Sequence, residues 1–312
     1  MTINKTMRAV LSALSYGEIQ VDAARAFANL KALDPLKIFN VKIDSKIYNG
    51  NFEVPVRVFF PSEEVKKKTE ETSDSWPVMI YFHGGGWVTD SLDNYERICA
   101  MLSKSTGKIV IVADYRLAPE HPFPAGLEDC YTVACSIFHD EFIFKVDREN
   151  VTIIGDSAGG NLAAAVCLLA RDRNEFKAKN QILIYPATNN DYSEHSVYKS
   201  VHENGSDYLL TCGKLQDYLN LYQSKEEDRL SPYFAPILED DLTNLPRALV
   251  ITAEFDPLRD EGEDYGRRMK DAGNEVEIHR IKDALHGYFA LGIKYLHVQE
   301  SLDLINQFIG EE

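Results

Sequence analysis

Few cysteines, no long apolar run and no excess of basic residues characterise this sequence of 312 residues. Its five cysteines are an odd number without a Cys-x-x-Cys pair, and the spacing of Cys130 and Cys135 does not match the common zinc sites. No apolar stretch reaches the roughly 18 to 20 residues that cross a bilayer. This cysteine usage suits a reducing compartment, so we predict a cytoplasmic protein without a metal site.

Acidic residues outnumber basic residues by 49 to 33, which gives a formal net charge of −16. An acidic protein repels nucleic-acid phosphates and anionic lipid headgroups, so we expect neither a nucleic-acid partner nor a membrane partner. The apolar share of 45% and the charged share of 26% are ordinary for a globular protein. At this length the chain forms one large domain or two small ones.

Short apolar runs alternate with helical stretches over most of the chain. The runs are too brief for helices and too continuous for strands with one wet face, and fully buried parallel strands have this composition. They lie at 78–82, 109–112, 151–154, 182–185 and 248–251, with helical stretches at 94–105, 127–138 and 162–171 among them. The alternation predicts an α/β fold in which helices cover both faces of a mostly parallel sheet.

Two features precede the first of these runs. Asn49-Gly50 lies between β-prone stretches at 40–48 and 54–60, which predicts a β-hairpin. Residues 62–75 mix acidic and basic side chains and contain almost nothing apolar, so we expect a solvent-exposed surface loop there.

Two segments do not fit the alternation. Residues 1–45 are predicted to be mainly helical, and residues 186–245 form an insertion whose length is usually functional in a compact fold. We interpret them as a two-part helical cap over one end of the sheet, with 46–185 and 246–312 as the core domain. The alternative is a helical insertion far from any site. An amphipathic helix is expected from Ile3, Met7, Val10, Leu11 and Leu14, and the insertion carries Tyr192, Tyr198, Tyr208, Tyr218, Tyr222 and Tyr233.

A Gly-x-Ser-x-Gly pattern at 155–159 follows one predicted strand and opens a predicted helix. In that context the serine occupies a sharp, strained turn that exposes its hydroxyl, so Ser157 is the candidate nucleophile. The flanking residues must be small because the turn is tight. Asp156 is expected to anchor the turn rather than to titrate in a reaction. The alternative is a glycine–serine loop without a catalytic role.

Three successive glycines at 84–86 follow another predicted strand, between His83 and Trp87. Such a run has a high cost in backbone entropy, which indicates that bare backbone must approach something closely. An oxyanion hole needs amide groups without side chains in the way. We predict that the Gly84 and Gly85 amides form it with the amide of Ala158, and that His83 supports the loop by hydrogen bonding.

A serine nucleophile needs a base, and the base needs an acid that orients it. His286 is the candidate base because it follows the predicted strand at 276–281, where a loop returns to the site. Asp256 is the candidate acid because it begins the loop after the strand at 248–253. The competing carboxylates are those of Glu254, Asp260 and Glu261. The chain order serine, aspartate, histidine is the order of an α/β-hydrolase.

Five motifs together resemble the hormone-sensitive-lipase family of α/β-hydrolases: HGGGW at 83–87, YRLAPE at 115–120, GDSAGG at 155–160, DPLRDEG at 256–262 and HGY at 286–288. The resemblance implies an α/β-hydrolase fold, an esterase for short acyl chains without metal or organic cofactor, and a two-part helical cap. It implies catalytic roles for Ser157, Asp256 and His286, and oxyanion roles for Gly84, Gly85 and Ala158. It also implies a homodimer, although no self-complementary surface can be read from the sequence.

The functional hypothesis is a serine carboxylesterase that hydrolyses short-chain esters of neutral alcohols through an acyl-enzyme. A carbohydrate acetyl esterase is an alternative because tyrosines in the insertion suit stacking on sugars. A non-enzymatic receptor is a second alternative; plant gibberellin receptors resemble this family but lack the histidine that is present here as His286. A peptidase of this fold is a third. Residues 191–245 carry 11 acidic and 4 basic residues, a net charge of −7 that would disfavour anionic substrates.

Overall fold

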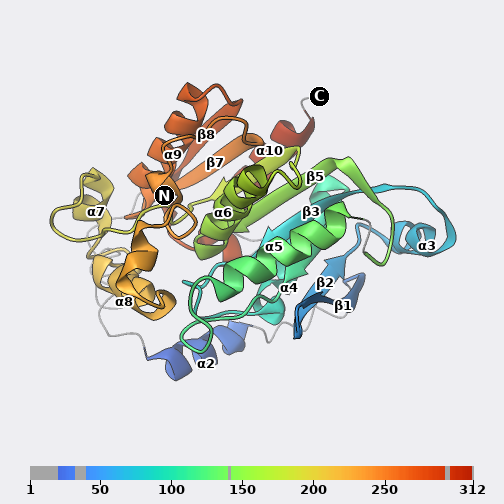
Figure 1. Ribbon diagram of the computed structural model, residues 1–312, viewed down its shortest axis with the longest axis horizontal. Coiled ribbons are helices and arrows are strands. Elements are labelled where there is room, and N and C mark those ends of the chain that lie inside the picture. The colour runs from blue at the N-terminus through green and yellow to red at the C-terminus, as the bar shows by residue number, and fades with distance from the viewer. Residues whose placement is uncertain (1–19, 32–39, 140–141, 292–295, 311–312) are drawn as a thin grey trace.

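The computed structural model describes residues 20–31, 40–139, 142–291 and 296–310, and its centre is an eight-stranded sheet (Figure 1). The strands lie in the order β1-β2-β4-β3-β5-β6-β7-β8. The β1–β2 and β2–β4 pairs are antiparallel and all other pairs are parallel. The strands are β1 (Lys42–Asn49), β2 (Phe52–Phe59), β3 (Trp76–Phe82), β4 (Ile109–Ala113), β5 (Val146–Asp156), β6 (Asn180–Ile184), β7 (Arg247–Phe255) and β8 (Val276–Leu285).

Helices cover both faces of this sheet, as the alternation predicted. On β3, Val78 and Ile80 join one buried apolar cluster while Met79 and Tyr81 join the other, because successive side chains of a strand point to opposite faces. The first cluster packs against α5 (Ala125–Phe138), α6 (Ala158–Arg173) and α9 (Arg259–Asp271), and the second against α4 (Leu92–Thr106) and α10 (Leu296–Gly310). The continuous apolar runs are therefore strands with two buried faces.

The predicted hairpin is confirmed, but the predicted loop after it is wrong. Strands β1 and β2 pair across Asn49-Gly50. Residues 63–71 form the helix α3 (Glu63–Glu71), which buries none of its side chains. Ser62 Oγ accepts a hydrogen bond from the Val65 amide at the start of this helix, and ion pairs four residues apart join Glu64 to Lys68 and Lys67 to Glu71. A capped start and such pairs stabilise a helix that has no apolar face.

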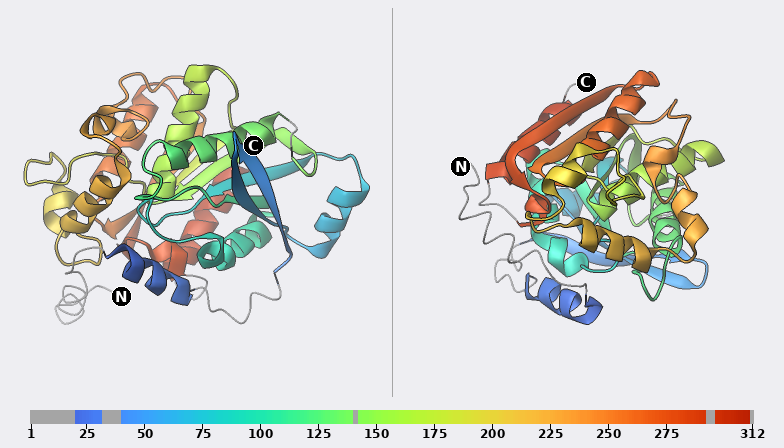
Figure 2. Two further views of the ribbon diagram at one scale, coloured as in Figure 1. Left: turned by 60° about the horizontal axis from the view of Figure 1, so that its bottom comes forward. Right: turned by 90° about the vertical axis from the view of Figure 1, so that its left-hand side faces the viewer.

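The described helices of the two predicted cap segments lie at the same end of the molecule (Figures 1 and 2). The first segment contributes α2 (Val21–Lys31), and the second contributes α7 (Lys199–Asn204), α8 (Cys212–Tyr222) and the 3-10 helices η2 (Glu226–Leu230) and η3 (Pro236–Leu238). The helix predicted around Met7 lies outside the described residues. No helix within the described ranges has the length and apolar character to span a membrane.

Candidate active site

Ser157 is the single residue between the end of β5 and the start of α6, so the chain turns sharply there. Ser157 has a positive φ of 55°, a region that non-glycine residues rarely adopt. A side chain on Gly159 would lie 2.0 Å from the Phe82 carbonyl oxygen, and one on Gly155 would lie 2.1 Å from the Gly159 oxygen. Small residues are therefore required on both sides of the serine, as the pattern predicted.

The side chains of Ser157, His286 and Asp256 form one hydrogen-bonded series. Ser157 Oγ lies 2.8 Å from His286 Nε2, and His286 Nδ1 lies 2.7 Å from Asp256 Oδ2. Because a carboxylate only accepts hydrogen bonds, Nδ1 donates to Asp256 and leaves Nε2 as the acceptor for the serine hydroxyl. Asp256 is fully buried, and its other oxygen accepts from the Leu258 amide at 2.9 Å. The geometry brings together the three residues that the sequence singled out and lets the imidazole receive the hydroxyl proton.

The three competing carboxylates bind elsewhere. Glu254 Oε2 accepts from the Asp283 amide at 2.7 Å, and Asp260 accepts from the Ser200 amide at 2.8 Å. Glu261 is fully buried, and burial raises its pKa to about 8. One of its oxygens accepts hydrogen bonds from the Thr188 and Asn189 amides and from the Tyr192 hydroxyl. These side chains hold loops in place, and Asp256 is the one that bonds His286.

The predicted oxyanion role of Gly84 is wrong. Its amide already donates to Asp156 Oδ1 and to the Tyr95 hydroxyl, both at 3.0 Å. Within the described part of the chain, by contrast, the amides of Gly85, Gly86 and Ala158 have no hydrogen-bond acceptor. Gly86 was not among the predicted residues, because a run of three glycines does not reveal which of its amides are bonded elsewhere.

Asp156 accounts for the orientation of Gly84. Besides the Gly84 amide, its carboxylate accepts hydrogen bonds from the hydroxyls of Tyr81 and Tyr95, both at 2.9 Å, and of Tyr185 at 3.3 Å. Burial raises the pKa of Asp156, and these donors act in the opposite direction. The residue thus ties the serine turn to the glycine loop.

His83 lies below the same loop and is fully buried. Its ring stacks on Tyr115 with centroids 4.4 Å apart, and its Nδ1 donates to the Gly84 carbonyl oxygen at 2.8 Å. The Tyr115 hydroxyl donates to the His83 carbonyl oxygen at 2.8 Å. This position agrees with support of the loop, as the sequence predicted.

A cavity of about 270 Å³ opens over Ser157 and His286. Gly85, Gly86 and Ala158 line it from the core, Ala24 from α2, and Leu210, Leu215 and Tyr218 from the insertion. Arg25 docks α2 onto the core, since it donates to the carbonyl oxygens of Val88 and Ala118 and pairs with Glu120 at 2.8 Å. Both predicted cap segments therefore contribute to the wall of the cavity.

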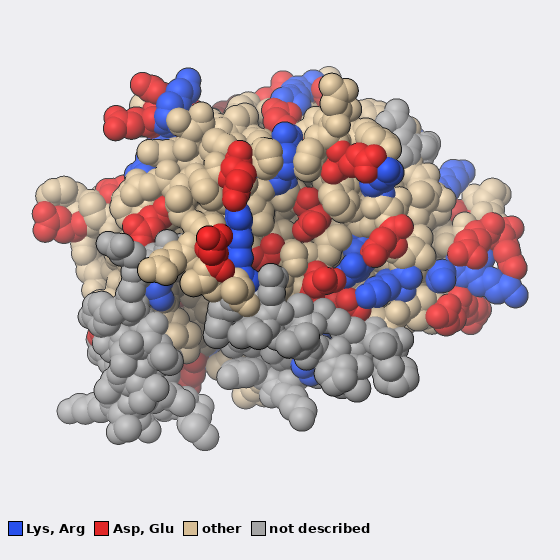
Figure 3. All heavy atoms as spheres, turned by 90° about the horizontal axis from the view of Figure 1, so that it is seen from below, with Lys and Arg blue, Asp and Glu red and all other residues tan. Residues whose placement is uncertain are grey.

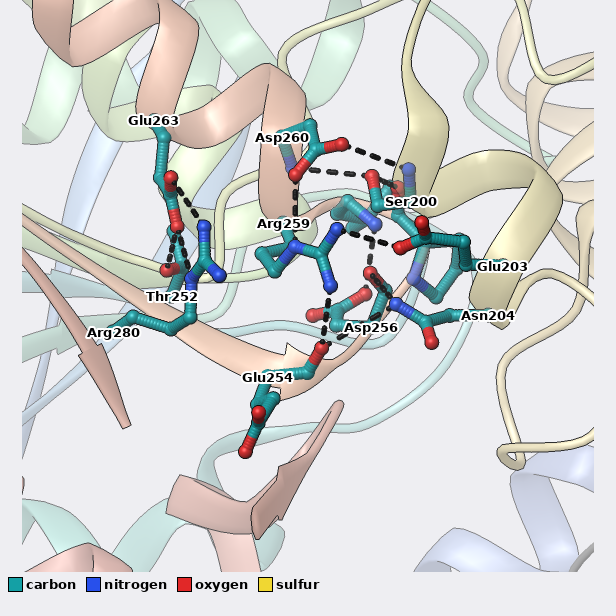
Figure 4. Close-up of polar contacts among 12 residues, drawn as sticks. Ser200, Glu203, Asn204, Thr252, Glu254, Asp256, Arg259, Asp260, Glu263 and Arg280 are labelled. Atoms are coloured by element: carbon teal, nitrogen blue, oxygen red, sulfur yellow. Dashed lines mark hydrogen bonds and ion pairs between the residues drawn. The ribbon is translucent and has the colours of Figure 1, made fainter. Parts of the chain in front are cut away.

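The loop that carries Asp256 is bonded to α7 of the insertion (Figure 4). Asn204 Nδ2 donates to the carbonyl oxygens of Asp256 at 3.2 Å and Glu254 at 3.3 Å. Ser200 Oγ donates to the Pro257 carbonyl oxygen at 2.7 Å, and Arg259 donates to the Glu254 carbonyl oxygen at 3.1 Å. Sequence reasoning missed Asn204, because no motif distinguishes it from other polar residues on short helices.

The face that includes α2 has no large area of one charge sign. Acidic and basic side chains are interspersed over its described surface (Figure 3). No group of three or more histidine, cysteine, aspartate or glutamate side chains in the described ranges is arranged to hold a metal ion.

Comparison with known proteins identifies the family of this chain. The sequence model of a protein family described as alpha/beta hydrolase fold matches residues 79–290 of this chain. An arylesterase from Saccharolobus solfataricus is 35% identical over 246 residues, which cover 78% of this chain and 76% of that protein. An ethyl acetate hydrolase from Pseudomonas putida is 31% identical over 287 residues, with coverage of 92% and 86%. A hyperthermophilic esterase structure from Pyrobaculum calidifontis aligns with a TM-score of 0.86 at 35% identity, over 99% of this chain and 98% of that chain. The chain therefore belongs to the α/β-hydrolase fold family, in its hormone-sensitive-lipase-like group.

Proposed function

We propose that this protein is a serine carboxylesterase that hydrolyses short-chain esters, from acetyl to about hexanoyl, of neutral alcohols. The observation that carries the proposal is the series from Ser157 Oγ through His286 to Asp256 at the floor of the cavity. Ester hydrolysis is also the activity named for the relatives from S. solfataricus and P. putida.

The reaction proceeds in two acyl transfers. His286 takes the proton of Ser157 as Oγ attacks the ester carbonyl carbon, and Asp256 stabilises the imidazolium that results. The amides of Gly85, Gly86 and Ala158 donate to the oxyanion of the tetrahedral intermediate. His286 then protonates the departing alcohol. A water molecule, deprotonated by the same imidazole, attacks the acyl carbon, and the imidazolium returns a proton to Ser157 Oγ as the acid leaves.

Residues 1–45 and 186–245 serve as the two-part cap in this proposal. Its support is that Ala24, Leu215 and Tyr218 all line the cavity over Ser157. Trp87, the residue after the three glycines, stacks on Tyr222 of the insertion with centroids 4.4 Å apart. A movement of the cap would therefore displace Trp87 and the adjoining glycines at 84–86.

A small ester suits this cavity better than a sugar ester. Of the six tyrosines that favoured a carbohydrate substrate, Tyr218 is the one that lines the cavity within the described part. The others pack or bond elsewhere, for example Tyr192 with Glu261 and Tyr233 with Asp172. A single half-buried ring is a poor platform for a sugar.

Hydrolysis of p-nitrophenyl esters of increasing acyl length tests the proposal. We expect kcat/KM to be highest between acetate and hexanoate and to fall for decanoate, because the cavity cannot enclose a long chain. p-Nitroacetanilide should be cleaved far more slowly than p-nitrophenyl acetate, which would exclude the peptidase alternative. Absence of turnover at every acyl length by the folded protein would contradict the proposal and favour a receptor.

Replacing Asn204 by Ala should lower kcat roughly tenfold with little change in KM, since small displacements of a catalytic group are costly. The substitution removes the hydrogen bonds from α7 to the carbonyl oxygens of Glu254 and Asp256 and loosens the position of the acid. Steady-state kinetics on p-nitrophenyl acetate measure the effect.

Asn220→Ala is the matched control, because that exposed asparagine of α8 bonds Gln216 and Arg229 rather than the acid loop. An equal loss in both variants, or a rise in KM alone for Asn204→Ala, would contradict the positioning role.

A further inference from the structure

Asp90 has a backbone conformation that favours glycine, yet it carries a charged side chain into the wall of the cavity. Its φ is +73°, in the left-handed region where a residue with a side chain is uncommon. Strained residues of this kind occur preferentially at functional sites. The side chain of Asp90 therefore requires an explanation that the backbone alone does not supply.

The structure assigns no architectural role to this carboxylate. Among the described residues it accepts one hydrogen bond, from the hydroxyl of its neighbour Thr89 at 3.1 Å, and that hydroxyl also donates to the Gly85 carbonyl oxygen. No lysine or arginine of the described chain pairs with Asp90, and none lines the cavity. Arg25 and Lys214 each stand next in sequence to a residue of the cavity wall, but both have other partners. Arg25 pairs with Glu120, and Lys214 donates to the Leu209 carbonyl oxygen.

The Asp90 carboxylate lies directly against the proposed oxyanion hole. A side chain on Gly85 would lie 2.8 Å from Asp90 Oδ2. A negative charge beside a developing oxyanion opposes the reaction of a neutral ester, because like charges repel more strongly in a partly desolvated site than in water. A substrate that brings a positive charge to Asp90 removes this repulsion and adds an attraction.

Tyr218 supplies an aromatic surface beside the same carboxylate. Its ring lies on Gly86, where a side chain would come within 2.4 Å of ring carbons. Burial raises the pKa of Tyr218 to about 12, and the negative charges of Asp90 and Asp217 contribute to the rise. A carboxylate next to an aromatic ring is the combination that binds ammonium groups.

We infer that Asp90 and Tyr218 form a subsite for an ammonium group, so the preferred esters carry a positive charge on the acyl or the alcohol side. This inference rests on the proposed esterase function and revises its substrate class: where the charge lies on the alcohol side, the neutral alcohols proposed above are not the preferred ones. It differs from a general effect of the acidic insertion, because Asp90 belongs to the core rather than to residues 191–245 and lines the cavity itself.

The test compares cationic esters with neutral esters of the same shape. Choline acetate is compared with 3,3-dimethylbutyl acetate for the alcohol side. The p-nitrophenyl ester of 4-(trimethylammonio)butanoate is compared with that of 5,5-dimethylhexanoate for the acyl side. We expect the wild type to prefer the cationic member of at least one pair by roughly tenfold in kcat/KM at low ionic strength. The preference should shrink as salt is added, and the pair that shows it identifies the side of the ester.

Asp90→Asn and Asp90→Gly should both abolish the preference, and glycine also relieves the backbone strain, so folding is not at risk. Tyr218→Leu should reduce the preference and Tyr218→Phe should retain it. Glu63→Gln removes one charge from the exposed helix α3 and should leave the ratio unchanged.

Equal rates for both members of both pairs in the wild type would overturn the ammonium subsite while the hydrolysis itself upheld the esterase. The assignment to Asp90 would be overturned if the preference survived Asp90→Asn. It would also be overturned if Glu63→Gln lowered the preference as much as Asp90→Asn does. Failure to hydrolyse either member of both pairs would overturn the proposed function, and the subsite with it.

Discussion

Replacement of Ser157 by Ala is expected to reduce ester hydrolysis by roughly 10⁵-fold or more, to the background of the assay. The hydroxyl has one partner in the described structure, His286 at 2.8 Å, and no other group at this position can attack the ester. Alanine differs from serine only by that oxygen, and α6 begins directly after it. Initial rates on p-nitrophenyl acetate measure the loss.

Thermal unfolding supplies the control for this variant. The melting temperature should stay within about 2 °C of the wild type, because no buried hydrogen bond other than that to His286 is removed. Activity of Ser157→Ala near the wild-type level would rule out this nucleophile. A large fall in melting temperature together with the activity would mean that the residue is structural.

Replacement of Asp256 by Asn is expected to lower kcat by roughly 10³- to 10⁴-fold, as loss of the orienting carboxylate does in serine hydrolases generally. The Leu258 amide donates to Oδ1, so the oxygen of the new carboxamide stays there and its NH₂ group faces His286 Nδ1. The imidazole must then accept at Nδ1 and carry its proton on Nε2. In that tautomer it cannot take the proton of Ser157.

Two conservative variants of the neighbouring acids serve as matched controls. Glu254→Gln and Asp260→Asn remove carboxylates of the same segment. The partner of Glu254 is the Asp283 amide, and those of Asp260 are the Ser200 amide and the Arg259 guanidinium. Each should cost less than about tenfold in kcat, because neither contacts the imidazole. If either costs more than Asp256→Asn, the assignment of the acid is wrong.

The elements that the sequence predicted well are those encoded by local chemistry. Continuous apolar runs such as 109–112 became strands buried on both faces, because no other structure hides so short an apolar segment. The Gly-x-Ser-x-Gly pattern predicted the turn at Ser157, because a side chain on Gly155 would collide with the backbone of Gly159 in the same turn. The helix α3 was missed because its stability comes from a cap and ion pairs rather than from an apolar face.

Carboxylates and glycine amides that look alike in the sequence are distinguished only by contacts between distant segments. Asp256, Glu254, Asp260 and Glu261 look alike in sequence, and only the approach of His286 distinguishes them. Gly84 and Gly86 are likewise equivalent until Asp156 binds the Gly84 amide and so turns it away from the cavity.

The sequence alone determined the family, the sheet and the turn at Ser157, because strand burial and tight-turn sterics act mainly between neighbours in the chain. Asp256 was predicted as the acid, but only its contact with His286 separates it from the other three carboxylates. The tertiary structure decided which backbone amides remain available, which helix of the insertion holds the acid loop, and that Asp90 and Tyr218 share the cavity wall. These depend on the direction in which a group points after folding, and residues about 50 to 130 positions apart set that direction through contacts such as those of Asn204 with Asp256, Gly84 with Asp156 and Ser157 with His286.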